Sequence, residues 1–269
     1  MSPRAHPSAE RGVALLTVLL LVAVLATLAA VVLDDIRFGL RRAANAEAVG
    51  QARWYALGAE TLAAGQIGRL TGGADRLTLD GGWADRPFSF PVENGLIQGR
   101  LTDGGSCFNL NSVVQGVGEV LSRREAGVAQ FIALMSALGV APREAEMLAA
   151  ALTDWIDSDG VRESGGAEDE AYLAGSPAYR TGGTLLAEVS ELRAVRGFTP
   201  AIYARLRPLV CALPTSDLSP INVNTLAPEK AVLITMVTEG EVSPELAQRV
   251  IAARPVGGWS VTDFWTQPA

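Results

Sequence analysis

The chain has 269 residues, a length that suits one large or two small domains with a substantial buried core. Its 22 basic and 29 acidic residues give a formal net charge of −7. That balance argues against nucleic-acid binding, which needs a basic face. One histidine, His6, and two cysteines, Cys107 and Cys211, exclude histidine-rich zinc sites, zinc fingers and scaffolds with several disulfides.

Residues 13–33 carry no charge and read VALLTVLLLVAVLATLAAVVL. As a helix this segment spans roughly 31 Å, enough for the apolar core of a bilayer. A secretory signal has a shorter apolar run of about 7–15 residues, although cleavage near Leu28-Ala29-Ala30 is an alternative. Arg4 and Arg11 precede the segment, and a positive flank stays on the cytoplasmic side. The segment is therefore expected to be a single-pass anchor that sends the C-terminal body across the membrane.

The leader, residues 1–12, is polar and ends in Gly12 directly before the apolar segment. This arrangement resembles the signal of type IV pilins and pseudopilins. The resemblance implies that a prepilin peptidase cuts after Gly12 and methylates the new N-terminus, Val13. The alternative is an ordinary signal anchor with a fortuitous glycine.

Most pilin-like proteins carry glutamate as the fifth mature residue, where this chain has Thr17. A carboxylate in lipid needs a partner, and in pilins that partner is the N-terminal amine of the neighbouring subunit. A subunit without the carboxylate is expected only at a fibre tip, where no further subunit lies above it.

A long helix is predicted to continue beyond the membrane, because residues 34–69 lack proline and favour helix. Apolar residues from Val49 to Ala63 recur with helical spacing. Two helices separated near Gly39 are the alternative. Alternating side chains and an Asn94-Gly95 turn then predict short antiparallel strands at 76–80, 88–92 and 96–103.

The rest of the chain is predicted to be mainly helical. Thr199 and Ser243 are expected N-caps, and Pro142, Pro200 and Pro244 first-turn residues. The predicted helices lie at 120–139, at 141–157, as a short pair within 188–208, at 226–237 and at 243–254. Helix pairs with a glycine-bearing link resemble helix–hairpin–helix DNA modules, but the acidic balance favours a compact helical scaffold.

Seven carboxylates lie between Asp154 and Glu170, in a loop interrupted by three glycines. Calcium takes about six to eight oxygen ligands from such loops, so the segment predicts a calcium site. A solvated acidic loop is the alternative.

An EF-hand count partly fits this loop. With Asp157 as position 1, Asp159 is at position 3 and Glu168 at position 12, where ligands belong. Val161 at position 5 offers no side-chain oxygen, and Arg162 replaces the glycine of position 6. A calcium site here would therefore have another shape.

Several stretches together resemble the general secretion pathway protein K family, the largest minor pseudopilins of bacterial type II secretion systems. The resemblance rests on residues 11–30, 108–113, 152–160, 166–173, 176–180, 188–214 and 221–225. It implies an α+β fold, in which a pilin-like N-terminal spine helix lies on a small antiparallel sheet and a large helical (SAM-like) domain is inserted. The implied organisation is a prepilin leader (1–12), the transmembrane start of the spine helix (13–33), a pilin-like helix and strands (34–106), the inserted helical domain (107–213), and a second helical subdomain with a C-terminal segment (214–269).

The resemblance also implies a non-enzymatic function. A minor pseudopilin of this type joins minor pseudopilins I and J in a tip complex that primes pseudopilus assembly and supports protein export across the outer membrane. Calcium is expected in the helical domain. By position, its ligands would be Asp157, Asp159, Glu163, Glu168 and Asp169, with Asp154 on the preceding helix less clearly included.

Cys107 and Cys211 each lie beside a predicted domain junction. An oxidising periplasm favours a disulfide between them. It would stabilise the fold by roughly 4–5 kcal/mol in the chain-entropy model, because the enclosed loop is long. Two buried free thiols are the alternative.

Two other functions compete with this interpretation. A signal-anchored periplasmic hydrolase is disfavoured, because the mature chain would contain no histidine and the sequence has no Gly-x-Ser-x-Gly motif. A competence-type DNA-uptake minor pilin would need a basic groove, which the acidic balance does not suggest.

Overall fold

The structure is a computed structural model that describes residues 8–73, 76–80, 82–93 and 95–266, with side chains from Val13 onward. Contacts divide the chain into two units, one of residues 1–67 and 89–99 and one of residues 68–88 and 100–269. In chain order the elements are α1 (Ser8–Thr71), β1 (Phe88–Val92), β2 (Gly95–Gly99), β3 (Phe108–Asn109), η1 (Leu110–Val113), β4 (Val114–Val117), β5 (Val120–Arg123), α2 (Glu125–Ala137), α3 (Pro142–Ile156), α4 (Asp169–Leu173), η2 (Val189–Arg193), α5 (Pro200–Leu206), β6 (Val210–Cys211), η3 (Pro228–Lys230), α6 (Val232–Val237), α7 (Pro244–Ala252) and α8 (Val261–Trp265).

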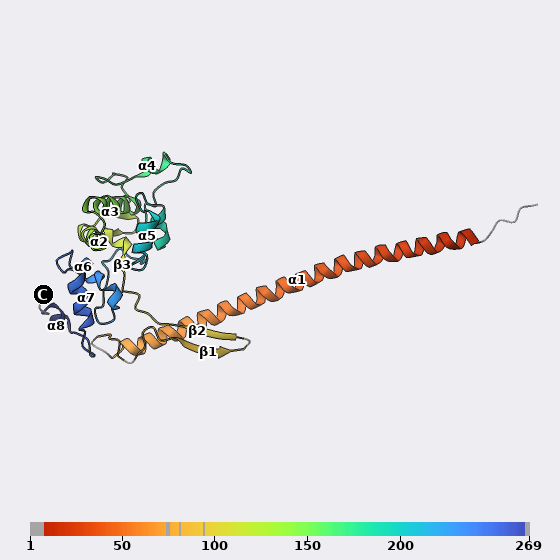
Figure 1. Ribbon diagram of the computed structural model, residues 1–269, viewed down its shortest axis with the longest axis horizontal. Coiled ribbons are helices and arrows are strands. Elements are labelled where there is room, and N and C mark those ends of the chain that lie inside the picture. Colours follow the sequence, from red (N-terminus) through yellow and green to blue (C-terminus); the bar gives the residue numbers. More distant parts are fainter. Residues whose placement is uncertain (1–7, 74–75, 81, 94, 267–269) are drawn as a thin grey trace, which may run out of the picture. The chain divides into compact units, whose positions relative to one another are not determined.

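The spine helix α1 runs without interruption from Ser8 to Thr71 (Figure 1), so the alternative break near Gly39 is wrong. A single glycine costs a helix only about 1 kcal/mol relative to alanine, and its helix-favouring neighbours offset that cost. From Val13 onward α1 is the one helix in the described part of the chain that is long and apolar enough to cross a membrane.

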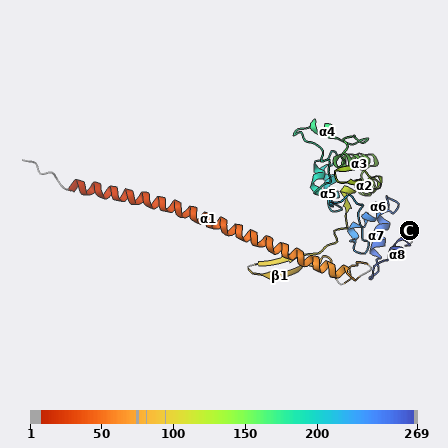
Figure 2. The same ribbon diagram turned by 180° about the vertical axis from the view of Figure 1, so that it is seen from behind.

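Strands β1 and β2 pair as a two-stranded sheet beside the later part of α1, as the two opposite views agree (Figures 1 and 2). The predicted strand at 88–92 is confirmed, whereas β2 ends at Gly99 and does not reach 103. The turn residue Asn94 lies outside the described residues.

The predicted strand at 76–80 is wrong. Local hydrogen bonds close turns there instead: the indole Nε1 of Trp83 donates to the carbonyl of Thr78 at 2.8 Å, and the N–H of Asp80 donates to the Thr78 hydroxyl at 3.2 Å. Alternation therefore misled the prediction, because backbone groups of this segment bond to the side chains of Thr78, Trp83 and Asn222.

The second unit packs its helices around an apolar core centred on α2, which contacts α3 and α6. Phe131 of α2 is fully buried. Its ring centroid lies 5.6 Å from that of Phe108 and 6.3 Å from that of Phe198. The core therefore joins segments that are distant in sequence.

The helix predicted over 120–139 begins only at Glu125, because residues 120–123 form β5. β5 pairs antiparallel with β4, with Val117 opposite Val120. The turn between them needs Gly118, whose φ of 65° suits glycine. The remaining helices largely follow the prediction: Thr199 accepts from the N–H of Ile202, Ser243 accepts from the N–H of Leu246, and the three prolines begin α3, α5 and α7.

β3 pairs in parallel with β6, which places Asn109 opposite Cys211. Beside this pair a disulfide joins Cys107 to Cys211 across a sequence separation of 104 residues. The bond closes the loop that contains β4, β5 and α2 to α5.

Candidate metal centre

The acidic loop between α3 and α4 is held at its start by two elements. The N–H of Asp157 donates to the carbonyl of Thr153 at 2.8 Å, which caps the last turn of α3. Ser158 pairs with Leu121 of β5 in both directions: its N–H donates to the Leu121 carbonyl at 3.1 Å, and its hydroxyl accepts from the Leu121 N–H at 3.0 Å. The carboxylates that follow are thus presented by fixed backbone.

Three carboxylates converge in this loop. Asp157, Asp159 and Glu168 each place one oxygen within 4.8 Å of the oxygens of the other two. They are the residues at positions 1, 3 and 12 of the EF-hand count. Clustered carboxylate oxygens are the ligands that calcium prefers.

Burial makes this cluster costly without a counter-charge. Asp157 is 5% exposed and Glu168 9%. Burial, with a smaller contribution from Asp159, raises the pKa of Asp157 to about 7. Burial, followed by the charge of Asp154, also raises the pKa of Glu168.

Two oxygens of the cluster, Asp157 Oδ1 and Glu168 Oε1, are buried and accept no hydrogen bond from the described residues. A buried carboxylate oxygen without a partner costs free energy unless a proton or a cation satisfies it. The residues present therefore fit a calcium ion.

Asp154 is fully buried beneath the loop. Its Oδ1 accepts a hydrogen bond from the N–H of Glu163 at 3.1 Å, and its Oδ2 has no partner among the described residues. The backbone at Gly166 lies very close to the Asp154 carboxylate. A Cβ atom at position 166 would be 2.1 Å from Asp154 Oδ2, so this position needs glycine. Asp154 thus holds the far side of the loop, a role that its spacing of one helical turn from Asp157 could have indicated.

Glu163 and Asp169, which the resemblance also predicts as ligands, face other groups. The Oε2 of Glu163 lies 3.8 Å from the Nη1 of Arg123. Asp169 forms an ion pair with Arg180 and accepts hydrogen bonds from the N–H and hydroxyl of Thr181 at 2.9 and 3.0 Å. The N–H of Thr181 is the main cause that lowers the pKa of Asp169.

The N-terminal residues singled out by sequence lie on α1. Gly12 falls within the helix, and Val13 is 62% exposed. The hydroxyl of Thr17 donates to the carbonyl of Ala14 at 2.9 Å. The polar group at this position is thus satisfied by its own helix, which suits an apolar surrounding.

Family models described as type II secretion system protein K match residues 106–215 and 221–269. The type II secretion system protein K of Klebsiella pneumoniae is 40% identical over 262 residues, which are 97% of this chain and 80% of that protein. The chain belongs to the type II secretion system protein K family.

Other members of the protein K family are similarly close. The protein K of Pectobacterium carotovorum is 38% identical over 263 residues, covering 97% of this chain and 80% of that protein. A solved structure, the crystal structure of the GspK-GspI-GspJ complex from enterotoxigenic Escherichia coli, matches with a TM-score of 0.73 and 35% identity, covering 84% of this chain and 78% of that chain. The α+β fold with its long N-terminal helix and large helical domain is therefore that of protein K.

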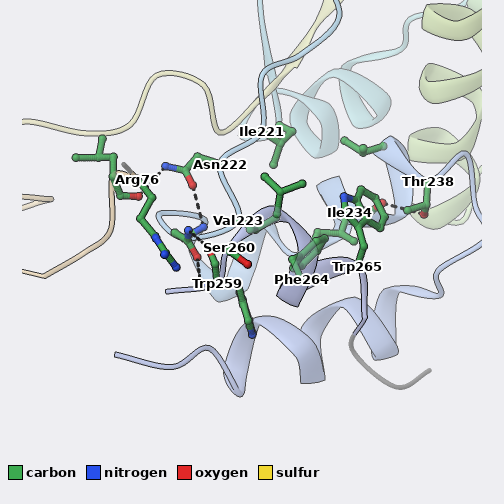
Figure 3. A pocket seen from close by; sticks show the side chains of 14 residues that line it. Arg76, Ile221, Asn222, Val223, Ile234, Thr238, Trp259, Ser260, Phe264 and Trp265 are labelled. Atoms are coloured by element: carbon green, nitrogen blue, oxygen red, sulfur yellow. Dashed lines mark hydrogen bonds between the residues drawn. The ribbon is translucent and has the colours of Figure 1, made fainter. Parts of the chain in front are cut away.

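A separate apolar hollow of about 550 Å³ lies in the second unit (Figure 3). Trp259 and Phe264 form part of its wall, with ring centroids 5.6 Å apart. Arg76 is the one charged side chain among the described lining residues. The lining thus brings together no group of carboxylates such as the acidic loop presents.

Proposed function

We propose that this chain is the minor pseudopilin that caps the pseudopilus of a type II secretion system. The observation that carries the proposal is its similarity to protein K in a solved complex with GspI and GspJ, at 35% identity over 84% of this chain. By this proposal the chain joins minor pseudopilins I and J in a tip complex that primes fibre assembly and supports export across the outer membrane.

The membrane anchor fits this role. α1 would insert in the inner membrane from Val13, with the body in the periplasm, after a prepilin peptidase cuts behind Gly12 and methylates Val13. Thr17 offers a neighbour's N-terminal amine no negative charge, and its hydroxyl already bonds to Ala14. Since an unpaired amine in lipid is costly, a subunit with Thr17 suits the end of a fibre and not its shaft.

The metal proposal follows from the acidic loop. Asp157, Asp159 and Glu168 would hold a calcium ion, and the buried oxygens without partners support this assignment. Bound calcium supplies the positive charge that makes these buried carboxylates stable as anions. Glu163 and Asp169 would then hold the loop through Arg123, Arg180 and Thr181.

The role we propose is structural and not enzymatic. The sequence has a single histidine, in the leader that processing would remove. A DNA-uptake minor pilin would need a basic groove and is less favoured, because the net charge of −7 does not suggest one.

Co-purification tests the proposal. The full chain, solubilised from membranes in mild detergent, should carry pseudopilins I and J with it, and its intact mass should show loss of residues 1–12 and gain of one methyl group. An uncut Met1 form contradicts pilin-type processing. Salt-sensitive retention on DNA, without I and J, would favour the uptake pilin instead.

A further inference from the structure

Just beyond the apolar segment, one face of α1 carries three arginines and an aromatic ring. At about 100° of rotation per residue, these side chains lie within an arc of roughly 140°. At about 1.5 Å per residue, the last of them is roughly 14 Å beyond Leu33 along the helix axis. We call this the arginine face; its members are Arg37, Phe38, Arg41 and Arg42.

Side chains of this face contact near neighbours on α1 and remain exposed. The guanidinium of Arg42 lies over the Phe38 ring, 5.7 Å from its centroid, and Phe38 is 62% exposed. Arg37 lies 3.8 Å from Asp34, with its side chain 73% exposed. Within the described residues no carboxylate lies in ion-pair distance of Arg41 or Arg42.

Helix geometry directs these side chains toward the membrane. In an α-helix every Cα–Cβ bond tilts toward the N-terminus, which here is the side of the apolar segment. Long arginine side chains extend back along the helix and keep their charged ends at the polar boundary. A polar layer of roughly 5–8 Å covers each side of the apolar core, so guanidinium groups from this face can reach it.

We propose that the arginine face binds the phosphates of anionic lipid headgroups where α1 leaves the membrane; this rests on the membrane anchor of the proposed function. Guanidinium groups bind phosphate oxygens in a bidentate manner, and aromatic rings favour the membrane–water boundary. Basic residues just after a span oppose its translocation. Lipid binding gives this cluster a use that offsets that disadvantage.

Native mass spectrometry of the full chain in detergent tests the inference, with phosphatidylglycerol and phosphatidylcholine as probes. Each basic residue near an anionic surface contributes about fivefold to binding. We therefore expect Arg41→Gln/Arg42→Gln to weaken phosphatidylglycerol binding roughly 10- to 30-fold, with little change for phosphatidylcholine. The matched control, Arg53→Gln/Arg69→Gln, removes two charges from α1 at about 30 and 54 Å beyond Leu33 and should bind as the original chain does.

The inference is overturned by unchanged phosphatidylglycerol binding in the Arg41/Arg42 variant, by an equal loss in the control, or by displacement of the lipid by an equal concentration of inorganic phosphate. Loss of cross-links to a partner protein with lipid binding intact would also overturn it. Alkaline extraction separates this from the proposed anchor. If all variants stay in the membrane, only lipid binding is in question; if the unaltered chain is released, the anchor itself fails.

Discussion

Asn224 binds the backbone of Trp259 with both ends of its side-chain amide. Its Nδ2 donates to the Trp259 carbonyl at 2.9 Å, and its Oδ1 accepts from the Trp259 N–H at 2.8 Å. Both residues are buried. The pair fixes the segment before α8 against the segment before η3, at the wall of the hollow in Figure 3.

The same arrangement occurs earlier in the chain, between Asn111 and Leu186. Asn111 Nδ2 donates to the Leu186 carbonyl at 3.0 Å, and its Oδ1 accepts from the Leu186 N–H at 2.8 Å. In both places the asparagine two residues earlier accepts a hydrogen bond through its Oδ1. Asn109 accepts from the N–H of Asn111 at 3.2 Å, and Asn222 accepts from the N–H of Asn224 at 3.0 Å. The second unit thus uses one Asn-x-Asn-Ser/Thr motif twice, near the start of each region matched by a family model.

Replacing Asn111 by alanine should destabilise the chain by about 2–4 kcal/mol, because backbone groups of the buried Leu186 and the half-buried Leu213 would lose their partners. Urea unfolding of the full chain in detergent measures this. Asn45→Ala, at an exposed position of α1, is the control and should change stability little. We call each asparagine that binds the N–H and carbonyl of one distant residue an asparagine clamp. Equal stability of Asn111→Ala and the unaltered chain would contradict a stabilising role for the clamp at Asn111.

Removing calcium should lower the melting temperature of the full chain by about 5–10 °C, if calcium is present at about 100 times its dissociation constant. Asp157→Asn should abolish the difference between melts in calcium and in EDTA. Asp169→Asn should retain it, because Asp169 faces Arg180 and Thr181. Loss of the calcium effect in Asp169→Asn as well as in Asp157→Asn would favour the ligand set inferred from family position over the cluster in the structure.

The metal-free chain should lose stability as the pH rises from about 4 to 7. Burial raises the folded-state pKa of Asp157 from 3.8 to about 7. In that window the folded state keeps a proton that the unfolded state has released, so stability is full below the window and falls through it. With calcium the trend reverses, because metal binding requires the deprotonated carboxylate. Melts in EDTA at pH 5 and pH 7.5 check this, and Asp157→Asn should flatten the difference.

Loss of the disulfide should cost roughly 4–5 kcal/mol in the chain-entropy model, since the bond closes a loop with a sequence separation of 104 residues. The variant Cys107→Ala/Cys211→Ala should unfold at lower urea concentration, and reduction of the unaltered chain should give a similar change. Non-reducing peptide mapping should link the two cysteines. Two thiols that can be alkylated without reductant would refute the bond.

The amino-acid sequence alone determined the features that depend on near neighbours. The charge-free run from Val13 and the proline-free continuation defined α1, and Thr199 and Ser243 with their following prolines marked helix starts that the structure confirms. The strand predicted at 76–80 and the helix predicted at 120–123 were wrong, because other groups bond to the backbone there. At 76–80 side chains close turns, and at 120–123 β4 supplies the hydrogen bonds. Family motifs supplied the fold class, because the match extends over most of the chain.

Tertiary structure decided which carboxylates meet. Glu168 and Asp169 are adjacent and chemically alike, yet Glu168 faces Asp157 and Asp159 while Asp169 faces Thr181. The start of α4 sends consecutive side chains in different directions, and spacing along the chain does not report that. The two asparagine clamps likewise join residues 75 and 35 positions apart. Such contacts form only when the packed core brings distant backbone together.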